Sequence, residues 1–145
     1  MPRILLGVLA MWLVGCGGGE TPEQLIRERI NQMAEAVEER DVGDFASGIA
    51  EDYRDLDGNS RDDVVRQIRQ IFLITNSLSV TTFVESIEIV SDEFALATVR
   101  VLVTDVDIRR FQIDGEGLTF ELEFVLDGDD WLVSSANTSA QFMRL

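Results

Sequence analysis

The chain has 145 residues, of which 12 are basic and 27 acidic, and it has no histidine. This length allows one domain once a leader is removed, and a hydrophobic content of 46% is enough for a buried core. The net charge of −15 repels phosphate backbones, so we expect no nucleic acid partner. Every basic residue is arginine. Codon composition and adaptation to a high-salt habitat are the two alternative explanations of this bias. Without histidine or lysine, catalytic triads, histidine-ligated metal sites and Schiff-base chemistry are excluded.

The first residues have the pattern of a secretory signal. Arg3 provides a short positive start, and residues 4–14 form an almost unbroken apolar run. This run is too short to cross a bilayer, which needs about 20 residues. It ends in Leu13-Val14-Gly15-Cys16, which resembles the lipobox of bacterial lipoproteins.

The lipobox resemblance implies that residues 1–15 are removed and that the thiol of Cys16 carries lipid as a thioether. Cys16 is the only cysteine, so no intramolecular disulfide can form. Residues 16–21 are rich in glycine and are expected to form a flexible tether. The resemblance to Gram-negative lipoproteins also implies, by their sorting rules, that Gly17 rather than aspartate after the cysteine favours the outer membrane over the inner one. We therefore expect a lipid-anchored protein of the cell envelope, on the outer membrane and facing the periplasm, with residues 22–145 as its single domain.

Helical patterns fill the first half of this domain. Capping residues followed by apolar residues at helical spacing predict three helices. The predicted helices span residues 22–40, 42–49 and 61–72, after the caps Thr21, Asp41 and Ser60. Residues 53–56 are predicted to form a short strand, followed by a turn at residues 57–59.

The second half changes to strand patterns. The predicted strands are residues 78–90, 94–104, 118–126 and 131–138, with a longer connection at residues 105–117. Apolar and polar residues alternate most clearly in the third strand. Residues 127–130 are predicted to form a hairpin turn. We expect Trp131, at the start of the last strand, to be buried against the helices.

This order of elements is similar to that of the nuclear transport factor 2-like (NTF2-like) fold, which includes the SnoaL-like polyketide cyclases and the ketosteroid isomerases. Three segments carry the resemblance: residues 36–45 (AVEERDVGDF), residues 50–53 (AEDY) and residues 128–133 (GDDWLV). The resemblance covers roughly residues 22–138. It implies an α+β fold in which three helices pack in a curved antiparallel sheet, forming a cone with an apolar pocket. Enzymes and pure binding modules both use this fold, so the resemblance does not settle the function.

The resemblance to the isomerases is incomplete at the positions that carry their chemistry. Asp57 falls where those enzymes keep their catalytic aspartate, and a pocket carboxylate could shuttle a proton. Met33, however, stands where they have a tyrosine that donates a hydrogen bond, and Gly58 replaces their usual proline. Asp57 also fits a simple turn residue beside glycine. Tyr53 is the other candidate for acid–base chemistry.

A metal site is not expected. Asp55, Asp57 and Asn59 are spaced as in part of a calcium loop. Tyr53 and Val64, however, stand where the first and last acidic ligands of such a loop should be. We therefore predict no metal and no cofactor.

These observations favour a non-enzymatic domain that binds a small apolar ligand or an envelope partner protein. The alternative is a SnoaL-like or ketosteroid isomerase-like enzyme that uses Asp57 or Tyr53 as its acid or base. A homodimer is left open. The residues predicted to line the ligand pocket are Met33, Tyr53, Phe120, Leu122 and Phe124.

Overall fold

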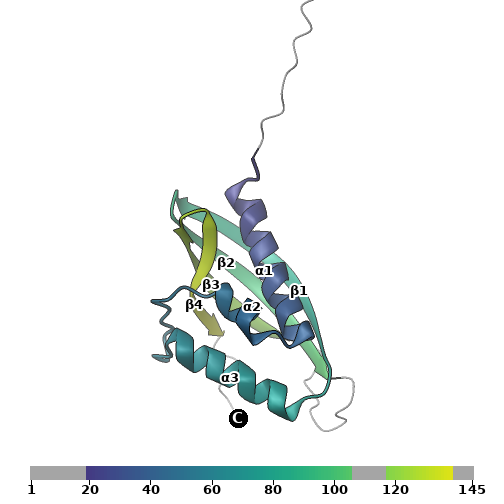
Figure 1. The fold of residues 1–145 in the computed structure, drawn as a ribbon. Helices are drawn as coiled ribbons and strands as arrows, with labels where there is room; N and C mark the ends of the chain where they lie inside the picture. The colour runs from purple at the N-terminus through teal and green to yellow at the C-terminus, as the bar shows by residue number, and fades with distance from the viewer. Residues whose placement is uncertain (1–18, 106–116, 139–145) are drawn as a thin grey trace, which may run out of the picture.

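The computed structural model describes residues 19–105 and 117–138 (Figure 1). The predicted signal peptide, Cys16 and most of the predicted connection before residue 118 lie outside the described residues. The elements, in chain order, are α1 (Pro22–Glu39), α2 (Val42–Ser47), α3 (Arg61–Ile74), β1 (Leu78–Ser91), β2 (Phe94–Asp105), β3 (Leu118–Asp127) and β4 (Asp130–Thr138). No described helix is long and apolar enough to cross a membrane.

The three helices begin at the predicted caps. Thr21 and Ser60 each form a capping box, in which the side chain accepts from the third helical residue and that residue's side chain accepts from the cap backbone. The Asp41 side chain accepts a hydrogen bond from the backbone of Asp44 at the start of α2. The prediction of α2 was too long at its end, because the helix finishes at Ser47 and Gly48 caps it.

The four strands form one antiparallel sheet in the order β1-β2-β3-β4. Each strand therefore pairs with its neighbour in sequence, as in a meander. Gly128, with φ of 61°, lies in the two-residue turn between β3 and β4, as the sequence predicts. Shifts in register after Val84, Ile89 and Glu123 mark irregularities that bend the strands locally.

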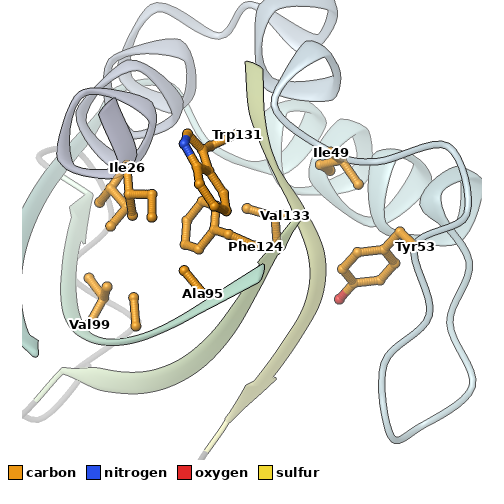
Figure 2. Packing of buried hydrophobic residues seen from close by; sticks show 10 residues of the cluster. Ile26, Ile49, Tyr53, Ala95, Val99, Phe124, Trp131 and Val133 are labelled. Atoms are coloured by element: carbon orange, nitrogen blue, oxygen red, sulfur yellow. The ribbon is translucent and has the colours of Figure 1, made fainter. Parts of the chain in front are cut away.

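The main hydrophobic core lies between α1 and the sheet. Trp131 and Phe124 are 3% and 0% exposed, and Figure 2 shows them close to Ile26 of α1. The predicted burial of Trp131 is therefore confirmed. Arg29 ties α1 to the same region, because its Nε donates to the carbonyl of Trp131 at 2.9 Å.

The segment predicted as a strand at residues 53–56 does not form one, so that prediction was wrong, whereas the turn predicted at residues 57–59 overlaps the observed turn, which runs from Asp55 to Gly58. Asp55 is the cause, since its carboxylate accepts hydrogen bonds from the backbone and side chain of Asn59. Gly58 completes the turn with φ of 84°, a left-handed conformation that suits glycine. Only Arg54 forms an isolated bridge, with Ser60.

Two long side chains join α1 to its neighbours. Arg40 follows α1 in a left-handed conformation, and its guanidinium donates to the carbonyls of Phe72 and Thr75 at the end of α3. This places a positive charge where the dipole of α3 is negative. Glu38 accepts a hydrogen bond of 2.7 Å from the backbone of Val80, on the edge strand β1.

Candidate functional site

An apolar cavity of about 310 Å³ lies between the helices and the sheet. It is lined by residues from all three helices, all four strands and the segment after α2. The lining residues are Ile30, Met33, Ala34, Val37, Phe45, Ile49, Tyr53, Val64, Ile68, Ile71, Leu78, Val80, Thr82, Val99, Val101, Val103, Leu118, Phe120, Leu122, Val133 and Ala136. None of these residues is an acid, an arginine or an amide.

The cavity lies beyond the packed core along the same elements. On α1 its lining begins at Ile30, about 12 Å along the helix from Pro22. On β2 the inward residues Ala95 and Ala97 belong to the packed core, whereas Val101 further along lines the cavity. The helix α3 forms another part of the wall, through Val64, Ile68 and Ile71.

Tyr53 touches the cavity with its ring, but its hydroxyl is already hydrogen-bonded. The hydroxyl donates to Asp55 Oδ2 at 3.1 Å and accepts from the backbone N–H of Ala136 at 3.2 Å. Figure 2 shows it turned toward β4. Burial of the ring raises the pKa of Tyr53, and the nearby Asp55 carboxylate raises it further. The phenol therefore keeps its proton and is poorly suited to act as a base.

Asp57 lies on the exposed turn before α3 and is not among the residues that line the cavity. Its neighbour Asp55 organises this turn. Burial alone would raise the pKa of Asp55, but hydrogen bonds from Asn59 and Tyr53 outweigh burial and lower it. Asp55 is therefore an ionised turn residue, which anchors the loop rather than acting on a ligand.

The other predicted site residues fall into two groups. Met33, Phe120 and Leu122 line the cavity together with Tyr53. Phe124 does not, because it lies further along β3, where Ile26 and Trp131 cover the sheet. Cys16 lies outside the described residues.

A second hollow lies between α2 and α3 and is lined partly by Arg61, Arg66 and Asp62. Arg61 donates to the carbonyls of Ala46 and Ile49, so it closes the end of α2. Arg66 forms an ion pair with Asp63 at 3.1 Å. These contacts give Arg61 and Arg66 structural roles. Within the described residues, no group of three or more carboxylates or cysteines could hold a metal ion.

Neither the family models nor the curated protein sequences contain a match to this chain. Solved structures do match it. A domain of unknown function with a cystatin-like fold from Nostoc punctiforme has a TM-score of 0.67 and 17% identity, covering 84% of this chain and 80% of its own. An NTF-2 like protein of unknown function from Shewanella oneidensis has a TM-score of 0.66 and 15% identity, covering 82% of this chain and 99% of its own. The chain has an NTF2-like fold.

A hexachlorocyclohexane dehydrochlorinase shares this NTF2-like fold, with a TM-score of 0.64 and 14% identity over 81% of this chain and 83% of its own. The NTF2-like fold predicted from the sequence is thus confirmed as helices packed on a four-stranded antiparallel sheet. Because the matched proteins include an enzyme and proteins of unknown function, the likeness supports the fold alone.

Most of the residues that line this cavity were not predicted from the sequence. Val99, Val101 and Val103 alternate along β2, and Ile68 and Ile71 are one turn apart on α3. Their periodicity marks them as inward-facing residues. A pattern of this kind does not distinguish a residue that faces a cavity from one that faces a packed core.

Proposed function

We propose that this chain is a lipid-anchored envelope protein whose NTF2-like domain binds a small apolar molecule without reacting with it. The composition of the cavity wall carries the proposal. Among the lining residues that the structure describes, none carries a carboxylate, and the one phenol is already engaged by Asp55 and Ala136. A wall of this kind can bury apolar surface, at about 25 cal/mol per Å², but it offers no group to move a proton.

The alternative of an isomerase-like enzyme has less support. Asp57 lies outside the cavity wall, and Met33 lines it at the position where a donor would be needed. A base without a partner to stabilise the developing charge gains little.

The same apolar wall would also fit an apolar side chain of an envelope partner protein, which is the other ligand that we consider.

The proposed tether suits this arrangement. The described domain begins just before Pro22, and its cavity starts about 12 Å further along α1. A lipid on Cys16 would therefore hold the domain by the end of α1 that is remote from the cavity. The cavity would then be open to molecules in the periplasm while the chain stays on its membrane.

Anchoring is tested with Cys16→Ser in cells labelled with radioactive palmitate. We expect the variant to lose both the label and the cleavage, because the thioether forms before the cut. A labelled Cys16→Ser protein would refute the lipobox assignment, and the binding proposal would be unaffected.

Binding is tested on residues 19–145, which contain every described helix and strand. The probe is N-phenyl-1-naphthylamine, whose fluorescence rises in apolar surroundings. Ala34→Phe places a ring in the cavity and is expected to weaken binding at least tenfold. Glu35→Phe adds the same ring on the exposed side of α1 and serves as the control. Equal binding by both variants would show that the probe does not occupy the cavity.

A further inference from the structure

The cavity wall offers a ligand almost no polar surface. Of the described lining residues, only Tyr53 and Thr82 have a side chain with an oxygen or nitrogen atom, and the Tyr53 hydroxyl is engaged with Asp55 and Ala136. A hydroxyl, carbonyl or amide of a ligand placed here would lose its hydrogen bonds to water and gain none. Such a loss weakens binding by about tenfold or more for each group. The portion of a ligand inside this cavity must therefore be hydrocarbon.

Charge further limits the part of the ligand outside the cavity. None of the lining residues that the structure describes is an arginine, and the mature chain would carry 11 arginines against 27 acids. The nearby guanidinium of Arg40 is committed to the carbonyls of Phe72 and Thr75. An anionic head group would thus approach a protein whose net charge is strongly negative, which disfavours its binding.

The cavity is open to solvent along α3. Ile71 lines the cavity and is also 41% exposed, so the cavity meets solvent beside this residue. A polar head can therefore remain in water while an attached chain enters the cavity. The volume of about 310 Å³ accommodates a chain of limited length. With about 30 Å³ for each group, the share of one water molecule, it holds about ten methylene groups.

We infer that the ligand of this cavity is an amphiphile with one hydrocarbon chain of about ten carbons inside and an uncharged head at the α3 opening. This inference rests on the proposed function, and it adds the chemical class and the length limit of the ligand. Two sources could supply this hydrocarbon chain, a free single-chain amphiphile or one acyl chain of a phospholipid.

The test is a series of linear primary alcohols from hexanol to tetradecanol, titrated into residues 19–145. Binding is followed by NMR of the methyl groups of Ile68, Val101 and Leu122, which line the cavity. We expect the affinity to rise about fourfold for each added methylene. The rise should stop near ten carbons, because further methylenes stay in water.

Two isomers and one charged analogue test the polarity argument. Decan-5-ol has the composition of decan-1-ol but its hydroxyl would enter the cavity, so we expect about tenfold weaker binding. Decanoate at neutral pH should also bind more weakly than decan-1-ol, because of the charge on the protein.

Two substitutions in the wall should move the length limit in opposite directions. Ala34→Leu adds about three carbons to the wall and should lower the limit to about seven. Val101→Ala removes about two carbons and should raise it to about twelve. Circular dichroism checks that both variants remain folded, and Glu35→Leu on the exposed side of α1 should leave the limit unchanged.

The outcomes separate this inference from the proposal on which it rests. If neither the naphthylamine probe nor any alcohol binds in the cavity, the proposed function fails. If the probe binds but the affinity does not depend on chain length, or if decan-5-ol binds as well as decan-1-ol, the inference alone is overturned. Phosphatidylcholine vesicles distinguish the sources: methyl shifts with vesicles assign the chain to a phospholipid, and shifts with alcohols only assign it to a free amphiphile.

Discussion

The two ends of α1 contact the sheet in different ways. At the packed end, Ile26 meets Ala95, Phe124 and Trp131, and these residues are at most 3% exposed. At the hollow end, Met33, Ala34 and Val37 face the cavity of about 310 Å³. The same helix and the same strands thus contain a close-packed region and a region with space for a ligand. Such a division lets the domain keep its stability at one end while the other end remains available for binding.

The strongest test of this division is Trp131→Ala at the packed end. Removing a buried tryptophan should lower the free energy of unfolding by about 3–5 kcal/mol. Denaturant melts of residues 19–145 measure the change. A loss of less than about 1 kcal/mol would mean that the packed end does not carry the stability. Leu132→Ala, on the opposite face of β4, is the matched control.

One substitution made at both ends sharpens the comparison. Ala97→Leu overfills the packed end, where Ala97 is 4% exposed, and should destabilise the fold by about 1–3 kcal/mol. Ala34→Leu extends into the cavity and should change the stability by less than about 0.5 kcal/mol. Thermal melts of the two variants measure the difference. Equal losses would show that the cavity collapses in solution.

Gly48 tests the contact between the segment after α2 and the cavity wall. A Cβ atom at this position would lie 2.7 Å from Met33 Sδ. Met33 has a flexible side chain and can move into the cavity, so Gly48→Ala should destabilise the fold by only about 1 kcal/mol. The moved side chain should also weaken ligand binding. In Met33→Ala the same glycine substitution should be almost neutral, which a double-mutant cycle measures.

The single tyrosine of the chain gives a test at alkaline pH. The pKa of Tyr53 is raised above its usual value of 10.0 in the folded chain, chiefly by burial. The unfolded chain therefore loses this proton at a lower pH than the folded chain does. The contribution of Tyr53 to the free energy of unfolding is full below about pH 10 and is lost as the pH rises above it. Absorbance at 295 nm should show phenolate forming together with unfolding. Ionisation near pH 10 without unfolding would contradict the buried hydroxyl.

Tyr53→Phe separates the hydroxyl from the ring. At neutral pH the variant loses the hydrogen bonds to Asp55 and Ala136, which should lower the stability by about 1 kcal/mol. Its stability should then fall less steeply above pH 10 than that of the parent chain.

The smallest expected effect is that of Asp57→Asn. This side chain lies on the exposed turn, outside both the packed end and the cavity. We expect stability and ligand binding to remain within experimental error of the parent chain. A large loss of binding with no loss of stability would give Asp57 a role that its position does not suggest. Asp55→Asn, in the same turn, should be more damaging because Asp55 holds Asn59.

The sequence was sufficient for the elements whose signals are local. Thr21, Asp41 and Ser60 cap their helices through contacts made within three residues, and alternation along residues 118–126 predicts β3. The strand predicted at residues 53–56 was wrong because the sequence pattern did not reveal the local hydrogen bonds of Tyr53 and Asp55. Their side chains form hydrogen bonds that compete with strand pairing.

The position of the cavity along the strands could not be predicted from the sequence. Phe120, Leu122 and Phe124 share one alternating pattern, which gives them the same face of β3. Whether a residue on that face meets a helix or a cavity depends on where α1 approaches the sheet. That approach is set by contacts distant in sequence, such as the one between Arg29 and Trp131. Periodicity therefore predicted which residues of the strand face the helices, but not which of them are closely packed and which line the cavity.

The hydrogen bond between Glu38 and Val80 has a consequence for self-association. An uncovered edge strand is a template on which another chain can add a strand and begin to aggregate. The strand β1 is long and contains the exposed apolar residues Phe83 and Val90, so its edge would be a hazard. α1 packs against β1, and Glu38 occupies one backbone N–H of the edge. Glu38 thus occupies one of the backbone donors with which an added strand would have to pair.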